Sequence, residues 1–141
     1  MNFEQERDGY LISTDKSKLK KDIVCEMIQN TYWASEREKA TIIKSIENSL
    51  CYGIYDGSIQ IAFARVITDY ATYAYLCDVI INEAYRGKGI GKWLMECVIN
   101  NPETSDVKKW RLVTKDAHGL YSRYGFKPLE FPEKDMEYRK V

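Results

Sequence analysis

An α/β domain with a mixed central sheet is the fold class that this sequence predicts. Predicted helices and strands alternate along the 141 residues, without a repeat, a low-complexity tract or a Pro- and Gly-rich linker. In the middle of the chain, consecutive strands joined by short turns indicate an antiparallel meander. A glycine-rich segment then joins the last of these strands to an amphipathic helix. This length fits one hydrophobic core, so we expect residues 1–141 to form a single domain.

The individual elements follow from the spacing of the apolar residues. Helical spacing predicts helices over about 17–31, 38–49 and 89–100, and a short helix that begins near residue 117. Strand-forming residues between turn signals, such as Asp56-Gly57, predict the strands. We expect strands at 10–13, 51–55, 58–68, 72–81, 110–114, 126–129 and 136–139.

Composition argues against several classes of partner. The chain has 21 basic and 21 acidic residues, so its net charge lacks the basic excess typical of a nucleic-acid binder. No apolar run approaches the roughly 20 residues of a membrane-spanning helix, and the N-terminus lacks the apolar core of a secretory signal. We therefore expect a cytoplasmic protein that binds neither nucleic acid nor membrane.

The cysteine and histidine pattern does not predict a metal site. Cys25, Cys51, Cys77 and Cys97 are too far apart to form CxxC pairs, and each lies among apolar neighbours. His118 is the single histidine of the chain. We expect free, mostly buried thiols and no bound metal.

The segment 85–93, YRGKGIGKW, has the properties of an anion-binding loop. Gly87, Gly89 and Gly91 leave the backbone N–H groups accessible and permit positive φ angles. The predicted helix begins at the same place, so its unpaired N–H groups and its dipole also favour an anion. Three cationic side chains surround this loop, those of Arg86, Lys88 and Lys92.

Two nucleotide-binding loops do not fit this spacing. A Walker loop requires GxxxxGK followed by Ser or Thr, whereas this chain has Arg86 at the first glycine position and Trp93 after the lysine. A Rossmann fingerprint requires GxGxxG, and here Lys92 occupies the position of its third glycine. A nucleotide-binding protein is therefore disfavoured.

The pattern that does fit is RxxGxG, from Arg86 to Gly91, between an apolar strand and a helix. It resembles the pyrophosphate loop of the GNAT superfamily of acyl-CoA N-acyltransferases. A second segment, DAHGLYSRYGF at 116–126, is similar to the late helix of that family and the Gly-Phe that ends it. The two motifs occur in the family's order, and the order of elements matches over nearly the whole chain.

The resemblance implies a fold and a donor substrate. In this family a mixed sheet of about six to seven strands, splayed between the fourth and fifth, is flanked by about four helices. Acetyl-CoA is the expected co-substrate, with its pyrophosphate on the glycine loop and its pantetheine on the edge of the preceding strand. By this resemblance the cofactor-binding residues are Val79, Ile80, Ile81, Arg86, Gly87, Lys88, Gly89, Ile90, Gly91 and Lys92.

The resemblance also assigns the chemistry, which is direct transfer of the acetyl group to an amine. Tyr121 aligns with the tyrosine that protonates the departing CoA sulfur. Family members often present a Glu or His base at the positions of Tyr75 and Cys77, and neither of these residues is a good base near neutral pH. Asp78 is the nearest carboxylate, but it would point to the other face of the sheet unless a bulge re-aims it. A water relay to Asp78 or Glu83, or binding of an already neutral amine, stays open.

Two further features bear on cofactor and acceptor binding. Thr114 stands where many family members have an Asn that contacts CoA. Tyr32 and Trp33 are candidate walls of an acceptor pocket, or alternatively a hydrophobic staple between helices. Arg65 lies on an otherwise apolar strand, so we expect it to pair with Asp78 or with an acidic group of the substrate.

Two functional classes remain from the sequence. Tyr75 belongs to a tyrosine-rich strand that would line the acceptor groove of an active enzyme, although aromatic residues also simply favour strands. The first class is an N-acetyltransferase acting on a small or protein amine. The second is an acyl-CoA-binding sensor of the same fold with weak turnover, which the unfilled base position keeps open. Homodimers are common among such domains.

Overall fold

The computed structural model describes residues 2–140 and contains a mixed six-stranded sheet with strand order β1-β2-β3-β4-β5-β6. Every neighbouring pair is antiparallel except β5 and β6, which run parallel. The strands are β1 (Glu4–Arg7), β2 (Tyr10–Ser13), β3 (Leu50–Asp56), β4 (Ile59–Thr68), β5 (Ala74–Ile81) and β6 (Trp110–Leu112).

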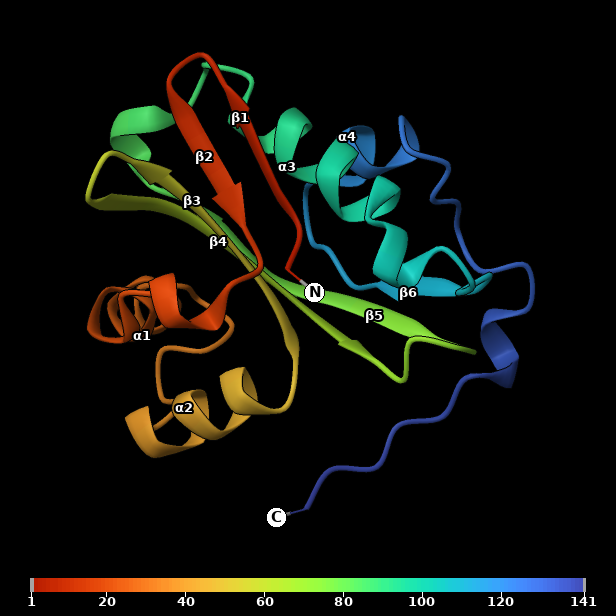
Figure 1. Ribbon diagram of the computed structural model, residues 1–141. Helices are drawn as coiled ribbons and strands as arrows, with labels where there is room; N and C mark the ends of the chain where they lie inside the picture. The colour runs from red at the N-terminus through yellow and green to blue at the C-terminus, as the bar shows by residue number, and fades with distance from the viewer. Residues whose placement is uncertain (1, 141) are drawn as a thin grey trace.

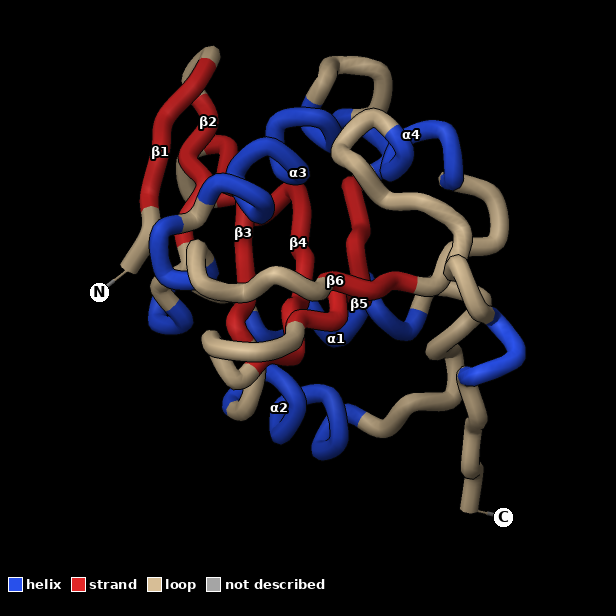
Figure 2. The backbone as a smooth tube through the Cα atoms, turned by 90° about the vertical axis from the view of Figure 1, so that its right-hand side faces the viewer, coloured by secondary structure: helices blue, strands red, loops and turns tan. Residues whose placement is uncertain are grey.

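The α-helices cover the two faces of this sheet. α1 (Lys21–Gln29) and α2 (Lys39–Glu47) lie against one face, and α3 (Ile90–Asn100) and α4 (His118–Ser122) lie on the other (Figures 1 and 2). Within residues 2–140 none of the helices has the length and apolar character needed to cross a membrane. The expected mixed sheet with four flanking helices is thus confirmed.

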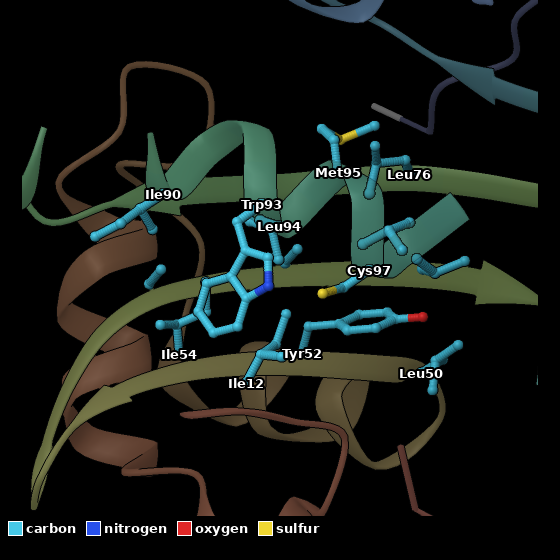
Figure 3. Close-up of a cluster of buried hydrophobic side chains, with 14 of the residues drawn as sticks. Ile12, Leu50, Tyr52, Ile54, Leu76, Ile90, Trp93, Leu94, Met95 and Cys97 are labelled. Atoms are coloured by element: carbon cyan, nitrogen blue, oxygen red, sulfur yellow. The ribbon is translucent and has the colours of Figure 1, made fainter. Parts of the chain in front are cut away.

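The core on the α3 face is the larger of two. Leu94, Met95 and Val98 of α3 are fully buried, and Trp93 is 4% exposed. They pack against the inward side chains of β2 to β5, among them Tyr52 (Figure 3). Because α3 begins directly after the glycine loop, this packing fixes the position of the loop on the sheet.

A second core lies between the sheet and the first two helices. Val24 and Ile28 of α1 and Ile42 of α2 are fully buried against Phe63 of β4. Ala34, in the loop between α1 and α2, belongs to the same cluster. This loop, residues 30–38, is therefore held close to the sheet face that carries Phe63.

The predicted first helix is divided in the structure. Residues 16–18 form a short 3-10 helix, and α1 starts only at Lys21, because Leu19 has extended backbone angles and those of Lys20 are also not helical. The N–H of Lys20 donates to the side-chain oxygen of buried Gln60, 2.9 Å away. A contact 40 residues away in the sequence therefore interrupts the helix.

Strand β1 was missed by the sequence prediction, because its four residues are all exposed and show no apolar alternation. It pairs with β2 through the Asp8-Gly9 turn, in which both residues have positive φ. The Asp-Gly pair is the same hairpin signal that located the turn at Asp56-Gly57, so it could have indicated this hairpin.

The two strands predicted at 126–129 and 136–139 do not form, which corrects the sequence prediction. These residues have no strand partner, and a 3-10 helix, Pro132–Lys134, lies between them. Phe126 instead packs edge-on against Tyr121. A strand-like residue pattern is not sufficient, because a β-strand also needs a neighbouring strand with which its main chain can form hydrogen bonds.

We predict that Leu94→Ala lowers the free energy of unfolding by about 2–5 kcal/mol, because it leaves a cavity in the main core. Urea unfolding followed by circular dichroism measures this change. Ile99→Ala on the same helix is the matched control, since Ile99 is 36% exposed and its truncation should cost much less. Equal losses for both variants would contradict the packing described for α3.

Candidate functional site

The glycine loop has the backbone geometry of an anion-binding site. Gly87 and Gly89 both have left-handed φ angles, +80° and +78°. For the N–H groups of residues 87–92, the described part of the chain provides no hydrogen-bond acceptor. Such unpaired N–H groups at the start of a helix favour a bound anion.

Gly91 gives independent evidence that the loop can bind an anion. A Cβ atom built on Gly91 meets no protein atom within 4 Å, and its backbone is helical. Neither packing nor φ therefore requires glycine there, and an alanine would even favour the helix. A ligand that approaches the backbone closely would account for it.

The charges around the loop are basic and largely exposed. Arg86 contacts Glu83 at 3.7 Å, with both side chains mostly in solvent. The Lys88 ammonium lies 5.3 Å from the ring centroid of Tyr85, whose hydroxyl donates to Asp56 at 2.8 Å. This hydrogen bond ties the loop to the end of β3. Arg86 also donates from its Nε to the main-chain oxygen of Ile81 at 3.4 Å, whereas Lys88 and Lys92 have no ion pair within residues 2–140.

Strands β5 and β6 separate soon after they begin to pair. Their register joins Ala74–Leu76 only to Trp110–Leu112, although β5 continues to Ile81. The edge of β5 from residue 77 to 81 therefore has no strand partner among the residues described. This is the predicted splay, since β5 and β6 are the fourth and fifth of the predicted strands, and its open edge includes Val79, Ile80 and Ile81.

A cleft of about 490 Å³ opens at this splay. We call it the β5–β6 cleft. Strand β5, the segment after β6, the start of α4 and the loop between α1 and α2 all contribute to its walls. Its lining residues include Tyr32, Trp33, Arg37, Arg65, Tyr75, Cys77, Asp78, Val79, Thr114, Lys115, Asp116 and Tyr121.

A bulge in β5 turns Asp78 into this cleft. Cys77 pairs with Arg65 and Ile80 pairs with Phe63, so two β5 residues, 78 and 79, lie opposite Ala64. Asp78 adopts a positive φ of 51°, which is uncommon for a residue other than glycine. The bulge thus brings Asp78 to the same face of the sheet as Arg65.

The Asp78 carboxylate is buried and receives three hydrogen bonds. Arg65 Nε and Arg37 Nη1 each donate to its Oδ2 at 2.9 Å, and Trp33 Nε1 donates to its Oδ1 at 3.2 Å. The Arg65 Nη1 also donates to the hydroxyl of Ser49. The expected pairing of Arg65 with Asp78 is confirmed, and two of the three donors come from the loop between α1 and α2.

This environment holds Asp78 as an anion. Burial alone would raise the pKa of its carboxyl, but the hydrogen bond and charge of Arg65, with Trp33 and Arg37, lower the pKa below its ordinary value. A carboxylate with a lowered pKa and occupied oxygens is a weak base. The geometry therefore indicates that Asp78 holds the loop between α1 and α2 in place.

The two residues at the family's base positions, Tyr75 and Cys77, are protonated near neutral pH, in contrast to Asp78. Burial raises the pKa of the Cys77 thiol to about 11. It also raises the pKa of the Tyr75 hydroxyl. Cys77 is consequently not a thiolate nucleophile in this structure.

Tyr121 lies in the cleft on the side opposite β5. Its ring is half-buried against the main core and meets Phe126 at a centroid distance of 6.1 Å. Burial, with a contribution from the negative charge of Asp116, raises the pKa of its hydroxyl. The hydroxyl therefore carries its proton at neutral pH and can donate it.

The outer wall of the cleft is aromatic. Tyr32 and Trp33 are 66% and 47% exposed and contact each other edge to face, so they do not form a staple between helices. The Lys115 ammonium lies 5.2 Å from the Tyr32 ring centroid. Because Lys115 follows β6, this contact crosses the mouth of the cleft.

The sequence analysis missed two of these residues, Arg37 and Lys115. Both belong to polar connections in which no motif distinguishes one cation from another. Arg37 acquires its place only because the loop folds back onto the bulge in β5. The sequence already offered Arg65 as a partner for Asp78, so nothing in it called for a second cation.

The chain is similar to known proteins both in a sequence family and in solved structures. Residues 47–128 match the family model described as the acetyltransferase (GNAT) domain. A Gibberella zeae protein named as a candidate acetyltransferase is 27% identical over 139 residues, with 83% of this chain and 78% of the relative covered.

Solved structures share the fold. A crystal structure of a candidate GNAT-family acetyltransferase from Xanthomonas campestris is 42% identical, with a TM-score of 0.91 and 96% of both chains covered. A GNAT-family acetyltransferase from Elizabethkingia anophelis with acetyl-CoA bound has 19% identity and a TM-score of 0.63, covering 93% of this chain and 88% of that one. The second likeness concerns the fold alone.

We predict that Asp78→Asn lowers the free energy of unfolding by about 3 kcal/mol at neutral pH, because it leaves two arginines without their buried anion. A lowered carboxyl pKa stabilises the fold above the ordinary value near 3.9 and loses that contribution as the pH falls through the folded-state pKa. The difference between the parent and Asp78→Asn should therefore shrink below about pH 4.

Urea unfolding between pH 3 and 7 measures this difference. Asp22→Asn is the control, because the Asp22 pair with Lys39 is exposed and its loss should change stability little. A pH-independent difference between Asp78→Asn and the parent would contradict an ionised, stabilising Asp78.

Proposed function

Because the chain belongs to the GNAT acetyltransferase family, we propose that it transfers the acetyl group of acetyl-CoA directly to a primary amine held in the β5–β6 cleft. One observation carries the proposal. The glycine loop and Tyr121 lie at the two ends of the open β5 edge, the loop just beyond Ile81 and Tyr121 facing the cleft. An extended donor can thus be held at its phosphate end while its acyl end reaches the acid.

The glycine loop fits the phosphate end of this donor. We infer that the N–H groups of residues 87–92 bind the pyrophosphate and that Arg86, Lys88 and Lys92 supply positive charge. The open main-chain edge from Val79 to Ile81 is available to pair with the amide groups of pantetheine. Bound acetyl-CoA supplies an activated thioester whose carbonyl accepts the amine.

Tyr121 is the proposed general acid. As the new C–N bond forms and the C–S bond breaks, the sulfur leaves with a negative charge, and the Tyr121 hydroxyl donates a proton to it. Its raised pKa keeps that proton in place before transfer. Solvent then restores the proton to the phenolate.

The acceptor must lose a proton before it attacks. Asp78 is held by three donors, and Glu83 is exposed beside Arg86, so we propose that the amine binds neutral or releases its proton to water. Arg37, Arg65 and Lys115 outnumber the two carboxylates of the cleft, Asp78 and Asp116, and this excess of positive charge favours the neutral form of a nearby amine.

The occupied Asp78 carboxylate also favours a second candidate, an acyl-CoA-binding sensor with weak turnover. The two candidates differ in a direct measurement. An enzyme releases free CoA from acetyl-CoA when amines are added, and a sensor binds acetyl-CoA without accelerating that release.

We predict that Tyr121→Phe lowers kcat by about 100-fold, because the sulfur then leaves without a positioned acid. Release of free thiol from acetyl-CoA with a panel of amines measures kcat. Acetyl-CoA affinity, measured by calorimetry, should stay close to that of the parent. Tyr70→Phe is the control, since Tyr70 lies outside the β5–β6 cleft. Turnover by Tyr121→Phe at the parental rate would remove Tyr121 from the acid role.

We predict that Gly91→Ala weakens acetyl-CoA binding by at least about tenfold while the free energy of unfolding is unchanged or higher. The new methyl group meets no protein atom, but it stands where the pyrophosphate would approach the backbone. Calorimetry and urea unfolding on the same preparation separate the two effects. Gly119→Ala is the control, because a Cβ there also meets nothing and Gly119 is outside the loop. Unaltered binding by Gly91→Ala would place the pyrophosphate elsewhere.

A further inference from the structure

The guanidinium of Arg37 keeps one of its edges free in the β5–β6 cleft. Its Nη1 donates to Asp78 at 2.9 Å, whereas its Nε and Nη2 have no hydrogen-bond acceptor within residues 2–140. No side-chain nitrogen of Arg37 is buried without a partner, so these two atoms are accessible, and the side chain as a whole is 26% exposed. The N–H groups of Nε and Nη2 are parallel, which is the geometry that binds a carboxylate through two hydrogen bonds. This edge can therefore receive an anionic group of a ligand.

Arg37 is also held in place before any ligand binds. Its main-chain N–H donates to the carbonyl of Ala34 at 3.1 Å, and its own carbonyl accepts from the side-chain amide of Gln29 at 3.0 Å. The Asp78 carboxylate fixes the far end of the side chain. A side chain that is already ordered loses little conformational freedom on binding, so the free edge can bind an anion at a low entropic cost.

The other two cations of the cleft have different surroundings. Arg65 donates from its Nε to Asp78 and from its Nη1 to Ser49, so its Nε–Nη2 edge is already in use. Lys115 forms no ion pair in the part of the chain that the structure describes, and its ammonium lies near the Tyr32 ring at the mouth. Lys115 therefore adds a positive charge that attracts anions to the entrance.

The carboxylates of the cleft do not suit an acceptor with several positive charges. Three donors occupy Asp78, and the second carboxylate, Asp116, is exposed. A polyamine or a lysine-rich peptide would meet this one available carboxylate together with three cations. Like charges disfavour such a ligand, whereas a ligand that carries a negative charge is attracted.

An apolar surface lies beside the free edge of Arg37. The indole N–H of Trp33 and the Nη1 of Arg37 donate to the two oxygens of the same carboxylate, so the indole and the guanidinium are neighbours. Tyr32 packs edge to face on Trp33, and Tyr75 belongs to the β5 wall. Such rings bind apolar and aromatic groups. The cleft volume of about 490 Å³ is in the range of small-molecule sites.

We propose that Arg37 binds a carboxylate of the acceptor, so that the acceptor is a small amine that also carries a carboxylate and an apolar group, as an aromatic amino acid does. The transfer step rests on the function proposed above, whereas the recognition of the carboxylate does not. In that step the amine forms the C–N bond and gives one proton to solvent, the C–S bond breaks, and the sulfur receives the Tyr121 proton. The carboxylate of the acceptor is not changed by the reaction.

Two amines of similar shape test the proposal through turnover. L-phenylalanine carries the carboxylate, and phenethylamine lacks it. We expect the parent to have the higher kcat/KM for L-phenylalanine. Arg37→Gln should lower this kcat/KM by at least about tenfold, chiefly through KM, because a charge-assisted pair of hydrogen bonds is lost. The kcat/KM of the same variant for phenethylamine should change much less.

Two further variants separate recognition of the carboxylate from a structural role of Arg37. Arg37→Lys keeps the charge without the paired donors, so it should recover part of the preference for L-phenylalanine. Lys44→Gln is the control and should keep the parental preference, because Lys44 is an exposed cation of α2 that lies outside the cleft. A role of Arg37 only in holding the loop between α1 and α2 would instead lower the rates with both amines alike.

A titration that needs no turnover tests the recognition by itself. Hydrocinnamate has the carboxylate and the aromatic ring but no amine, and hydrocinnamamide is its neutral analogue. By calorimetry we expect the parent to bind the acid more tightly than the amide, and we expect Arg37→Gln to lose this preference. If no amine releases CoA but the acid binds through Arg37, the function proposed above is wrong and the recognition of the carboxylate stands.

Three results would overturn the proposal. They are a parent that prefers phenethylamine to L-phenylalanine, equal losses with both amines in Arg37→Gln, and equal binding of hydrocinnamate and hydrocinnamamide by the parent.

Discussion

The arrangement of the site depends on the ion pairs that the buried Asp78 carboxylate forms with Arg65 and Arg37. An isolated charge in this position would be costly, so the fold supplies Arg65 from β4 and Arg37 and Trp33 from the loop between α1 and α2. The same contacts bring the aromatic pair Tyr32 and Trp33 to the mouth of the cleft. One ion pair network thus joins the β5 bulge, the neighbouring strand and the wall of the site.

The glycine loop and the open edge of β5, the proposed donor side of the site, have a different physical basis. They depend on backbone rather than on side-chain charge: left-handed glycines, the unpaired N–H groups that begin α3, and the open edge of β5. Helix α3 is anchored by six buried side chains against the sheet, so the loop before it is held in place.

Much of the fold could be predicted from the sequence because its signals are local. The glycine spacing, the apolar period of α3 and the strands β2 to β5 were predicted within two residues of their observed ends. The predictions failed where a contact with a residue or strand distant in the sequence decides whether a helix or strand forms. Gln60 interrupts the first helix from 40 residues away, β1 has no apolar face, and the segments at 126–129 and 136–139 alternate like strands but have no partner edge.

The sequence by itself determined the family, the anion-binding character of the loop at 86–92 and the choice of Tyr121 as the candidate acid. Each of these conclusions depends on a short pattern of residues that are close together in the sequence. Only the tertiary structure decided what Asp78 does. Its position on a bulge and its three donors come from segments 13 to 45 residues away, and they turn a candidate base into a fixed anion. The protonation of a buried group depends on the charges that folding brings around it, and no local pattern encodes those.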